Sequence, residues 1–118
     1  MSRDYRQWLE DILEGCGKIL RFTAQMSLDE FVEDEKTYDA VVRNLEIIGE
    51  AAKNVPDDIR LRYPSIEWRK IAGLRDIIAH EYFGIDNDIL WDIIQNKVGS
   101  LQEEVRKLMD NGNELLQK

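Results

Sequence analysis

Residues 35–54, EKTYDAVVRNLEIIGEAAKN, decide the fold of this chain. Apolar side chains return every three or four positions through this stretch, at Tyr38, Val41, Leu45, Ile48 and Ala52. That spacing gathers them along one side of an α-helix, whereas a half-buried strand would alternate them every second residue. We therefore expect a long amphipathic helix that packs one side against the rest of the chain.

The same spacing continues on both sides of this helix. An earlier helix is predicted from the stripe Tyr5, Trp8, Leu9, Ile12, Cys16, Ile19 and Thr23. A long last helix is predicted from Leu90, Ile94, Val98, Leu101, Val105 and Leu108. No run alternates as a strand does, and two prolines leave long helices intact. The expected fold is an all-α antiparallel bundle of four to five helices, forming one domain over residues 1–118.

Polar residues, prolines and a glycine predict the helix ends. The run SLDE at 27–30 has the form of a capping box that opens a short helix. Pro56 suits the first turn of a second short helix, which Pro64 ends. The remaining predicted boundaries are Ser65 as the cap of the next helix, Gly84 as its stop, and Asp86 or Asn87 as the cap of the last helix.

Charge is unevenly distributed along the chain. The net charge is −8, which argues against a broad surface for polyanions. Residues 43–75 hold seven basic and five acidic groups, a net +2, while the segments before and after each carry −5. An anion could therefore be held locally at this basic segment, although a solvated helix face would look the same.

The cysteine content and the hydropathy pattern are typical of a cytoplasmic protein without a membrane span. The chain has a single cysteine, so it can form no internal disulfide, and a reduced cytoplasmic setting is expected. The N-terminal segment is charged throughout, unlike a signal peptide. The longest uncharged run, FTAQMSL, is far shorter than a membrane span, so we expect no membrane partner.

Residues 73–86, GLRDIIAHEYFGID, hold the only histidine of the chain, His80. Asp76 lies four residues before it, close enough on a helix to orient the imidazole. Arg75 lies five residues before it and points about 140° away on a straight helix. Either the long guanidinium curls round the helix, or two copies of the chain share one cleft, which predicts a homodimer.

These residue types suit RNA cleavage without a metal ion or cofactor. An imidazole can move a proton near neutral pH, and a guanidinium can hold the phosphate oxygens. RNA supplies its own 2′-hydroxyl nucleophile, so the protein needs no reactive serine or cysteine. The spacing alone leaves a structural explanation open, because a single histidine on a helix is often only a surface or hydrogen-bonded residue.

The motif resembles the Arg-x4-His-x-Tyr motif of the HepT-like toxins, members of the HEPN superfamily. RNLEIIGEAAKNVP at 43–56, IRLRYPSIEWRKIAGLRD at 59–76 and YFGIDNDILWDII at 82–94 are also similar to segments of that family, in the same order. The resemblance covers nearly the whole chain. It implies a helical homodimer that joins two Arg/His motifs in one cleft.

The resemblance also implies a function. Active members are metal-independent endoribonuclease toxins of type VII-like toxin–antitoxin pairs, so Arg75 and His80 would be catalytic. The antitoxin is an MntA-type minimal nucleotidyltransferase that transfers AMP to the motif tyrosine, which is Tyr82 here. On a helix Tyr82 lies beside Arg75, so the added phosphate would occupy the guanidinium that RNA requires.

Further residues are candidates for supporting roles. Asn44 and Glu50 lie on the helix that faces the motif in this family, so either could orient Arg75 or His80, as could Asp76. An exposed, salt-bridged helix face explains the same residues equally well. Arg69 and Lys70 are candidates for contact with RNA.

Two other functions fit the sequence. The chain could be a catalytically inactive HEPN module that binds a nucleotide or substrate beside a nucleotidyltransferase, which would suit its acidic surface. It could also be a structural dimer in which the motif only ends a helix.

Overall fold

The computed structural model describes residues 4–80 and 86–117, and in these ranges it is helical, with no strand. The side chains of Ile77, Ala79, His80 and residues 112–117 are outside this description. No helix in the described ranges is long and apolar enough to cross a membrane. The helices are α1 (Tyr5–Thr23), α2 (Leu28–Glu33), α3 (Glu35–Asn54), α4 (Asp57–Arg62), α5 (Trp68–His80), α6 (Asn87–Asn96) and α7 (Val98–Gln117).

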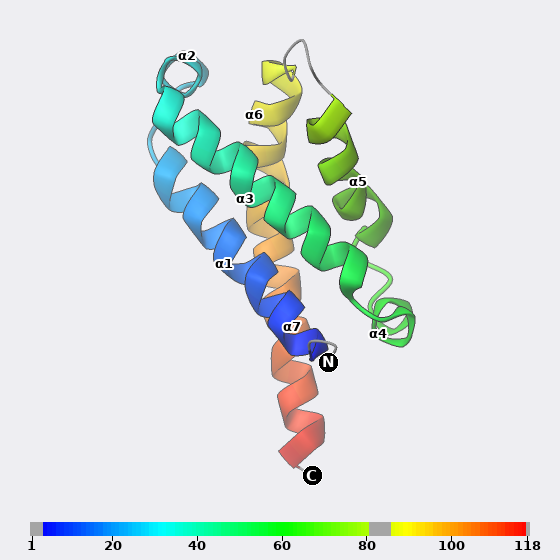
Figure 1. The fold of residues 1–118 in the computed structure, drawn as a ribbon. Helices are drawn as coiled ribbons and strands as arrows, with labels where there is room; N and C mark the ends of the chain where they lie inside the picture. Colours follow the sequence, from blue (N-terminus) through cyan, green and yellow to red (C-terminus); the bar gives the residue numbers. More distant parts are fainter. Residues whose placement is uncertain (1–3, 81–85, 118) are drawn as a thin grey trace.

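The long helices form the antiparallel bundle that the sequence predicts. Helix α3 lies between α1 and α5 (Figure 1). Helix α1 packs against α7 as well as against α3. Helix α3 runs opposite to α1, and α5 runs opposite to α3 (Figure 1). Helices α6 and α7 then return behind α3 (Figure 1). The short helices α2 and α4 lie at the two ends of α3 and turn the chain.

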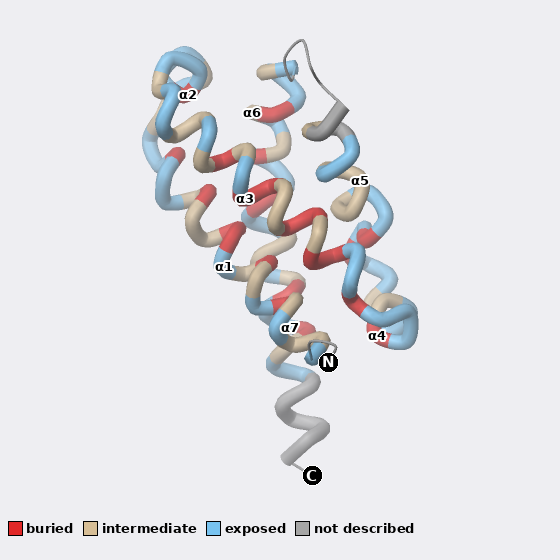
Figure 2. Tube along the Cα trace, viewed as in Figure 1, coloured by how far each residue is buried: buried red, intermediate tan, exposed pale blue. Residues whose placement is uncertain are grey.

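The core fills the space between α1, α3, α6 and α7. Figure 2 shows the buried positions of α1 and α3 as stripes along the sides that face each other. The predicted apolar stripes are confirmed, since their central members are almost fully buried. These are Leu9, Ile12, Cys16 and Ile19 on α1, Val41, Leu45, Ile48 and Ala52 on α3, and Leu90, Ile94, Val98, Val105 and Leu108 on the last two helices.

Two of the predicted helix caps, Ser27 and Asp86, are confirmed. The capping box of α2 is complete: the side chain of Ser27 accepts from the backbone N–H of Glu30, and that of Glu30 accepts from Ser27. Asp86 caps α6 by accepting from the N–H groups of Asp88 and Ile89. Pro56 lies one residue earlier than predicted, at the cap of α4. Gly84 lies outside the described residues.

The prediction that Ser65 caps the following helix is wrong, because α5 begins at Trp68. Before it the chain makes a turn in which the N–H of Ile66 donates to the carbonyl of Tyr63, and Ile66 is buried. The indole N–H of Trp68 donates to the same carbonyl at 3.1 Å. Burial of these two side chains delays the start of the helix, so tertiary packing overrides the local capping signal.

The last helix is interrupted, although the sequence predicts a continuous one. Helix α6 ends at Asn96 and α7 begins at Val98. The junction NKVGS, at 96–100, contains Asn, Val, Gly and Ser, which are all weaker helix formers than Ala or Leu. The N–H of Leu101 still donates to the carbonyl of Lys97 at 3.0 Å, and the apolar stripe continues through the junction. The break is therefore local and leaves the core intact.

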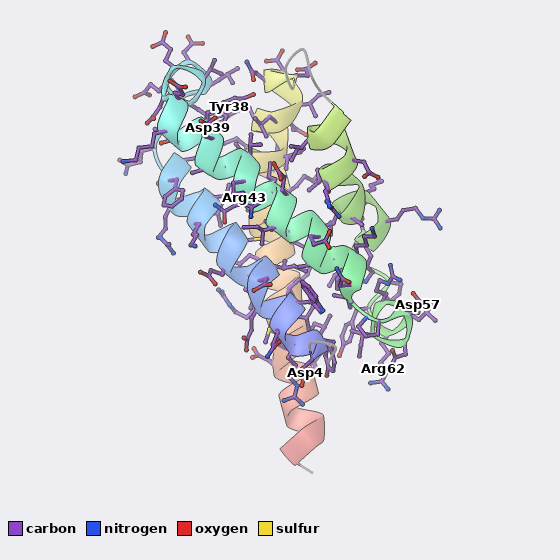
Figure 3. The ribbon with its side chains drawn as sticks, in the orientation of Figure 1. Asp4, Tyr38, Asp39, Arg43, Asp57 and Arg62 are labelled. Carbon is purple, nitrogen blue, oxygen red and sulfur yellow. The ribbon has the colours of Figure 1, made fainter. Side chains whose placement is uncertain are left out.

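Tyr38 ties the start of α6 to α3 (labelled in Figure 3). Its hydroxyl donates to the side-chain carbonyl of Asn87 at 2.8 Å, and its ring stacks on Phe31, which also contacts Trp91. Burial raises the pKa of Tyr38, so the phenol stays protonated and able to donate. This contact fixes the chain immediately after residues 81–85, which complete the Arg-x4-His-x-Tyr motif.

Candidate functional site

Gly49 lets α5 approach α3 closely at the position of Arg75. A Cβ atom at Gly49 would lie 3.1 Å from the backbone nitrogen of Arg75 and 3.2 Å from the carbonyl oxygen of Ile71. Both are backbone atoms of α5, which cannot rotate away as the end of a side chain can. The absence of a side chain at Gly49 therefore sets the distance between the two helices where the motif begins.

The next residue of α3, Glu50, holds the side chain of Arg75. Its carboxylate oxygen Oε2 forms an ion pair with Nη1 of the guanidinium, and both side chains are about half exposed. Nδ2 of Asn54, one turn later, donates to the other carboxylate oxygen of Glu50 at 3.3 Å and to its carbonyl at 2.8 Å. Two neighbouring residues of α3 thus fix the backbone and the charged group of Arg75.

We expect Gly49→Ala to destabilise the protein and Gly73→Ala to leave it equally or more stable. Both changes improve helix propensity by up to about 1 kcal/mol. Only the first forces backbone atoms apart, because a Cβ at Gly73 meets no described atom within 4 Å. The free energy of unfolding in urea should differ between the two variants by about 1–3 kcal/mol. Equal stabilities would mean that the helices do not meet this closely at Gly49.

Arg75 and Gly73 mark two different sides of α5. The backbone and guanidinium of Arg75 face α3, whereas Gly73 borders a groove between α5 and the last two helices. Position 80 lies seven residues after position 73 and falls on nearly the same side, about 20° away on a helix. The helical register therefore separates positions 75 and 80 by about 140° within one chain, and Arg75 directs its guanidinium toward Glu50 of α3.

The other candidate residues are in varied surroundings. Asn44 is only 8% exposed, and its Nδ2 donates to the carbonyl of Ala40 on its own helix at 2.8 Å. Asp76 is exposed on α5. The structure thus joins Glu50 to Arg75 and places Asn44 in the bundle, where its amide is satisfied within α3. The side chain of His80 and all of Tyr82 lie outside the described residues.

Arg69 and Lys70, the two candidates for contact with RNA, lie on the edge of the groove beside α5. Nζ of Lys70 contacts Glu67 at 2.7 Å, and this hydrogen bond lowers the pKa of the Glu67 carboxyl and raises the pKa of Lys70. Lys97, at the junction of α6 and α7, borders the same groove from the other side. Arg69 and Lys97 form no ion pair within the described part of the chain. The positive charge of the motif-bearing segment is therefore partly free to bind an anion.

Cys16 is not suited to act as a nucleophile. It is fully buried on α1, and burial raises the pKa of its thiol to about 12. The thiol is therefore neutral near pH 7, whereas the thiolate is the reactive form. Among the described residues no three acidic, histidine or cysteine side chains lie close enough to hold a metal ion together.

Gly49 and Asn54 are the positions that the sequence did not single out. Glycine inside an amphipathic helix lowers helix stability, so its presence beside Glu50 is a signal of close packing on that side. Asn54 gave no such signal, since asparagine is common in the last turn of a helix. Only the fold shows that its amide reaches the carboxylate that holds Arg75.

Comparison with known proteins gives consistent matches. Residues 12–108 match the family model described as Ribonuclease HepT-like. The chain is 47% identical over 108 residues to "Putative RNase MJ0127" of Methanocaldococcus jannaschii, covering 92% of this chain and 89% of that protein. It is 43% identical over 108 residues to "Probable ribonuclease HepT" of Thermococcus cleftensis, covering 92% and 98%. No solved structure matches significantly.

Proposed function

Because the chain belongs to the ribonuclease HepT-like family, we propose that it is a metal-independent endoribonuclease with Arg75 and His80 as its catalytic residues. The observation that carries this proposal is the placement of Arg75. Its guanidinium is half exposed, and α3 holds it from both the backbone and the side chain. A preorganised, accessible cation is what a phosphodiester-cleaving site requires.

In the proposed reaction the RNA supplies the nucleophile. The 2′-oxygen attacks the adjacent phosphorus, the bond to the 5′-oxygen of the next nucleotide breaks, and a 2′,3′-cyclic phosphate forms. His80 either takes the proton of the 2′-hydroxyl, while water protonates the departing 5′-oxygen, or protonates the 5′-oxygen, while water takes the proton of the hydroxyl. Arg75 donates two hydrogen bonds to the non-bridging oxygens and offsets the negative charge that grows in the transition state. Glu50 orients the guanidinium until the phosphate displaces it.

We propose that a homodimer completes the site. Positions 75 and 80 lie about 140° apart around α5, so one chain does not readily direct both side chains at the same phosphate. A twofold arrangement can bring Arg75 of one protomer beside His80 of its partner. This geometry is the reason to expect that a monomer would be inactive.

We propose that an MntA-type nucleotidyltransferase antitoxin blocks the site by transferring AMP from ATP to Tyr82. The oxygen of the tyrosine attacks the α-phosphorus of ATP, pyrophosphate leaves, and the hydroxyl proton passes to solvent or a base. The added phosphate would compete with RNA for Arg75. Each AMP unit adds about 329 Da, so the intact mass of protein expressed with the partner reports this step directly.

The proposed activity is tested with purified, unmodified protein and total RNA in excess EDTA. We expect cleavage fragments that end in a 2′,3′-cyclic phosphate. Fragments that appear only when a divalent ion is added would contradict the metal-independent mechanism.

The second candidate function is a non-cleaving module that binds a nucleotide or substrate beside a nucleotidyltransferase. The ion pair with Glu50 favours it, because the guanidinium of Arg75 is already neutralised in the free chain. The net charge of −8 favours it too, since it weakens binding of RNA. Calorimetry separates the two: tight binding of a nucleotide, with no RNA cleaved at high protein concentration, would support this function.

A further inference from the structure

A groove of about 770 Å³ runs between α5 and the α6–α7 junction, with α3 as its floor. Helix α5 packs mainly on α3, which leaves its opposite side facing this space. The walls are apolar: Leu45, Ile48, Ile66, Ile71, Leu74 and Leu101 are among the lining residues. A few polar side chains interrupt them, including Ser65, Asn96 and Glu104. Apolar walls with a few polar groups are typical of small-ligand sites of this volume.

The rim of the groove is basic, whereas the chain as a whole is acidic. Arg69 and Lys70 border it on α5, and Lys97 borders it where α6 meets α7. Glu67 also lines the groove: it pairs with Lys70, and the charge of Lys97 helps to lower the pKa of its carboxyl. Arg69 has no ion-pair partner among the described residues, and three basic residues against Glu67 leave the rim with a net positive charge. In a chain of net charge −8, this local positive rim favours an anionic ligand.

One of the residues that line the groove, Glu104, holds a hydrogen-bond acceptor without a partner. The Oε2 atom of Glu104 is buried and accepts no hydrogen bond from any described residue. Because this oxygen is closed to solvent in the free chain, an occupant can donate an N–H to it only after the Glu104 side chain turns toward the groove. That hydrogen bond would offset the cost of the unpaired acceptor. Nucleobases carry such N–H groups on their edges, and their flat faces can be sandwiched between aliphatic side chains.

We propose that this groove binds one nucleotide of the RNA substrate, with the base between the apolar walls and its phosphate at Arg69, Lys70 and Lys97. The proposal rests on the ribonuclease function above and names a subsite for it. The groove lies on the side of α5 that carries Gly73 and, by helical register, position 80. A nucleotide held there flanks the proposed scissile phosphate and determines where the RNA is cut.

A second copy of the chain is a less suitable occupant. A twofold contact through the groove would bring together three basic residues, Arg69, Lys70 and Lys97, and two acidic ones, Glu67 and Glu104, from each protomer. Both sides of that contact would carry a net positive charge. RNA brings phosphates that neutralise these three residues instead. Charge complementarity thus distinguishes the two occupants.

Gly73 offers a direct test, because a side chain added there enters the groove without meeting a described atom within 4 Å. Gly73→Phe should fill the groove and leave the fold intact. Gly99→Phe is the matched control: Gly99 is an exposed helical glycine with equally open surroundings, but it does not line the groove. Both changes are made in a His80→Ala background so that RNA is bound but not cut.

The measurement is the affinity for a fluorescein-labelled oligoribonucleotide of mixed sequence, with sedimentation of each variant to record its oligomeric state. We expect Gly73→Phe to weaken binding about tenfold or more, the scale of losing contact with one base, and Gly99→Phe to leave it unchanged. Lys97→Ala should weaken binding and lower its salt dependence. Equal affinity for both phenylalanine variants would overturn the proposal, as would conversion of Gly73→Phe alone to a monomer.

These outcomes separate the subsite from the proposed function. RNA cleavage by the wild-type protein, with no effect of Gly73→Phe on binding in the His80→Ala background, removes the subsite and leaves the ribonuclease. Binding that Gly73→Phe weakens, by a wild-type protein that never cleaves, removes the ribonuclease and leaves the subsite. A wild-type protein that neither binds nor cleaves RNA overturns both.

Discussion

His80→Ala is expected to lower the rate of RNA cleavage by about 10²–10⁴-fold, the usual contribution of a general acid or base. His80 is the only histidine of the chain, so no other imidazole can replace it. The loss should appear in kcat rather than in the affinity for RNA, because the imidazole acts on protons that move only in the transition state. Single-turnover cleavage of a labelled oligoribonucleotide measures both quantities.

The control for this variant is its stability. Position 80 is the last residue of α5, and alanine favours the helix at least as well as histidine. Thermal unfolding of His80→Ala should therefore match that of the wild-type protein. Cleavage at the wild-type rate by a folded His80→Ala protein would show that the histidine has only a structural role.

Arg75→Ala is expected to lower cleavage by about 10²–10³-fold, the scale of removing one donor from a site of growing negative charge. Unlike His80→Ala, it should also weaken binding of RNA, since the guanidinium contacts the phosphate in the bound substrate as well as in the transition state. It removes the ion-pair partner of Glu50, but Asn54 still donates to the carboxylate and the side chain is about half exposed, so water can solvate it. We therefore expect little change in stability.

Arg75→Lys is the matched variant for this prediction. It keeps the positive charge but loses the planar, two-donor geometry of the guanidinium. If two hydrogen bonds to the phosphate are required, the lysine variant should recover RNA binding and little of the cleavage rate. Full activity of Arg75→Lys would mean that only the charge matters, and wild-type activity of Arg75→Ala would exclude arginine from the site.

The sequence predicts the bundle because its signals act locally. The apolar stripe of α3 and the capping box at Ser27 depend on residues three or four positions apart, so their spacing is visible before the chain folds. Two predictions fail where packing decides. The burial of Ile66 and Trp68 delays the start of α5, and a run of weak helix formers around Lys97 interrupts the last helix.

The contacts of the candidate site are harder to predict from the sequence, because they join residues that are far apart along the chain. The link between Glu50 and Arg75 spans 25 residues and depends on how closely two helices pack. The sequence suggests Glu50 as one of several candidates, and the fold shows its contact with Arg75 together with the contacts of Gly49 and Asn54. The groove beside Gly73 is also a property of the packing, since it exists only because α5 rests mainly on α3.

The claim that Arg75 and His80 act together across two protomers is tested most directly by mixing two inactive variants. Arg75→Ala and His80→Ala proteins are unfolded together, refolded and assayed for RNA cleavage. If each site takes its arginine from one protomer and its histidine from the partner, half of the dimers are mixed and each mixed dimer holds one intact site, so about one quarter of the wild-type activity returns. If both residues of a site come from the same protomer, the mixture stays as inactive as its components, and that result would contradict the account.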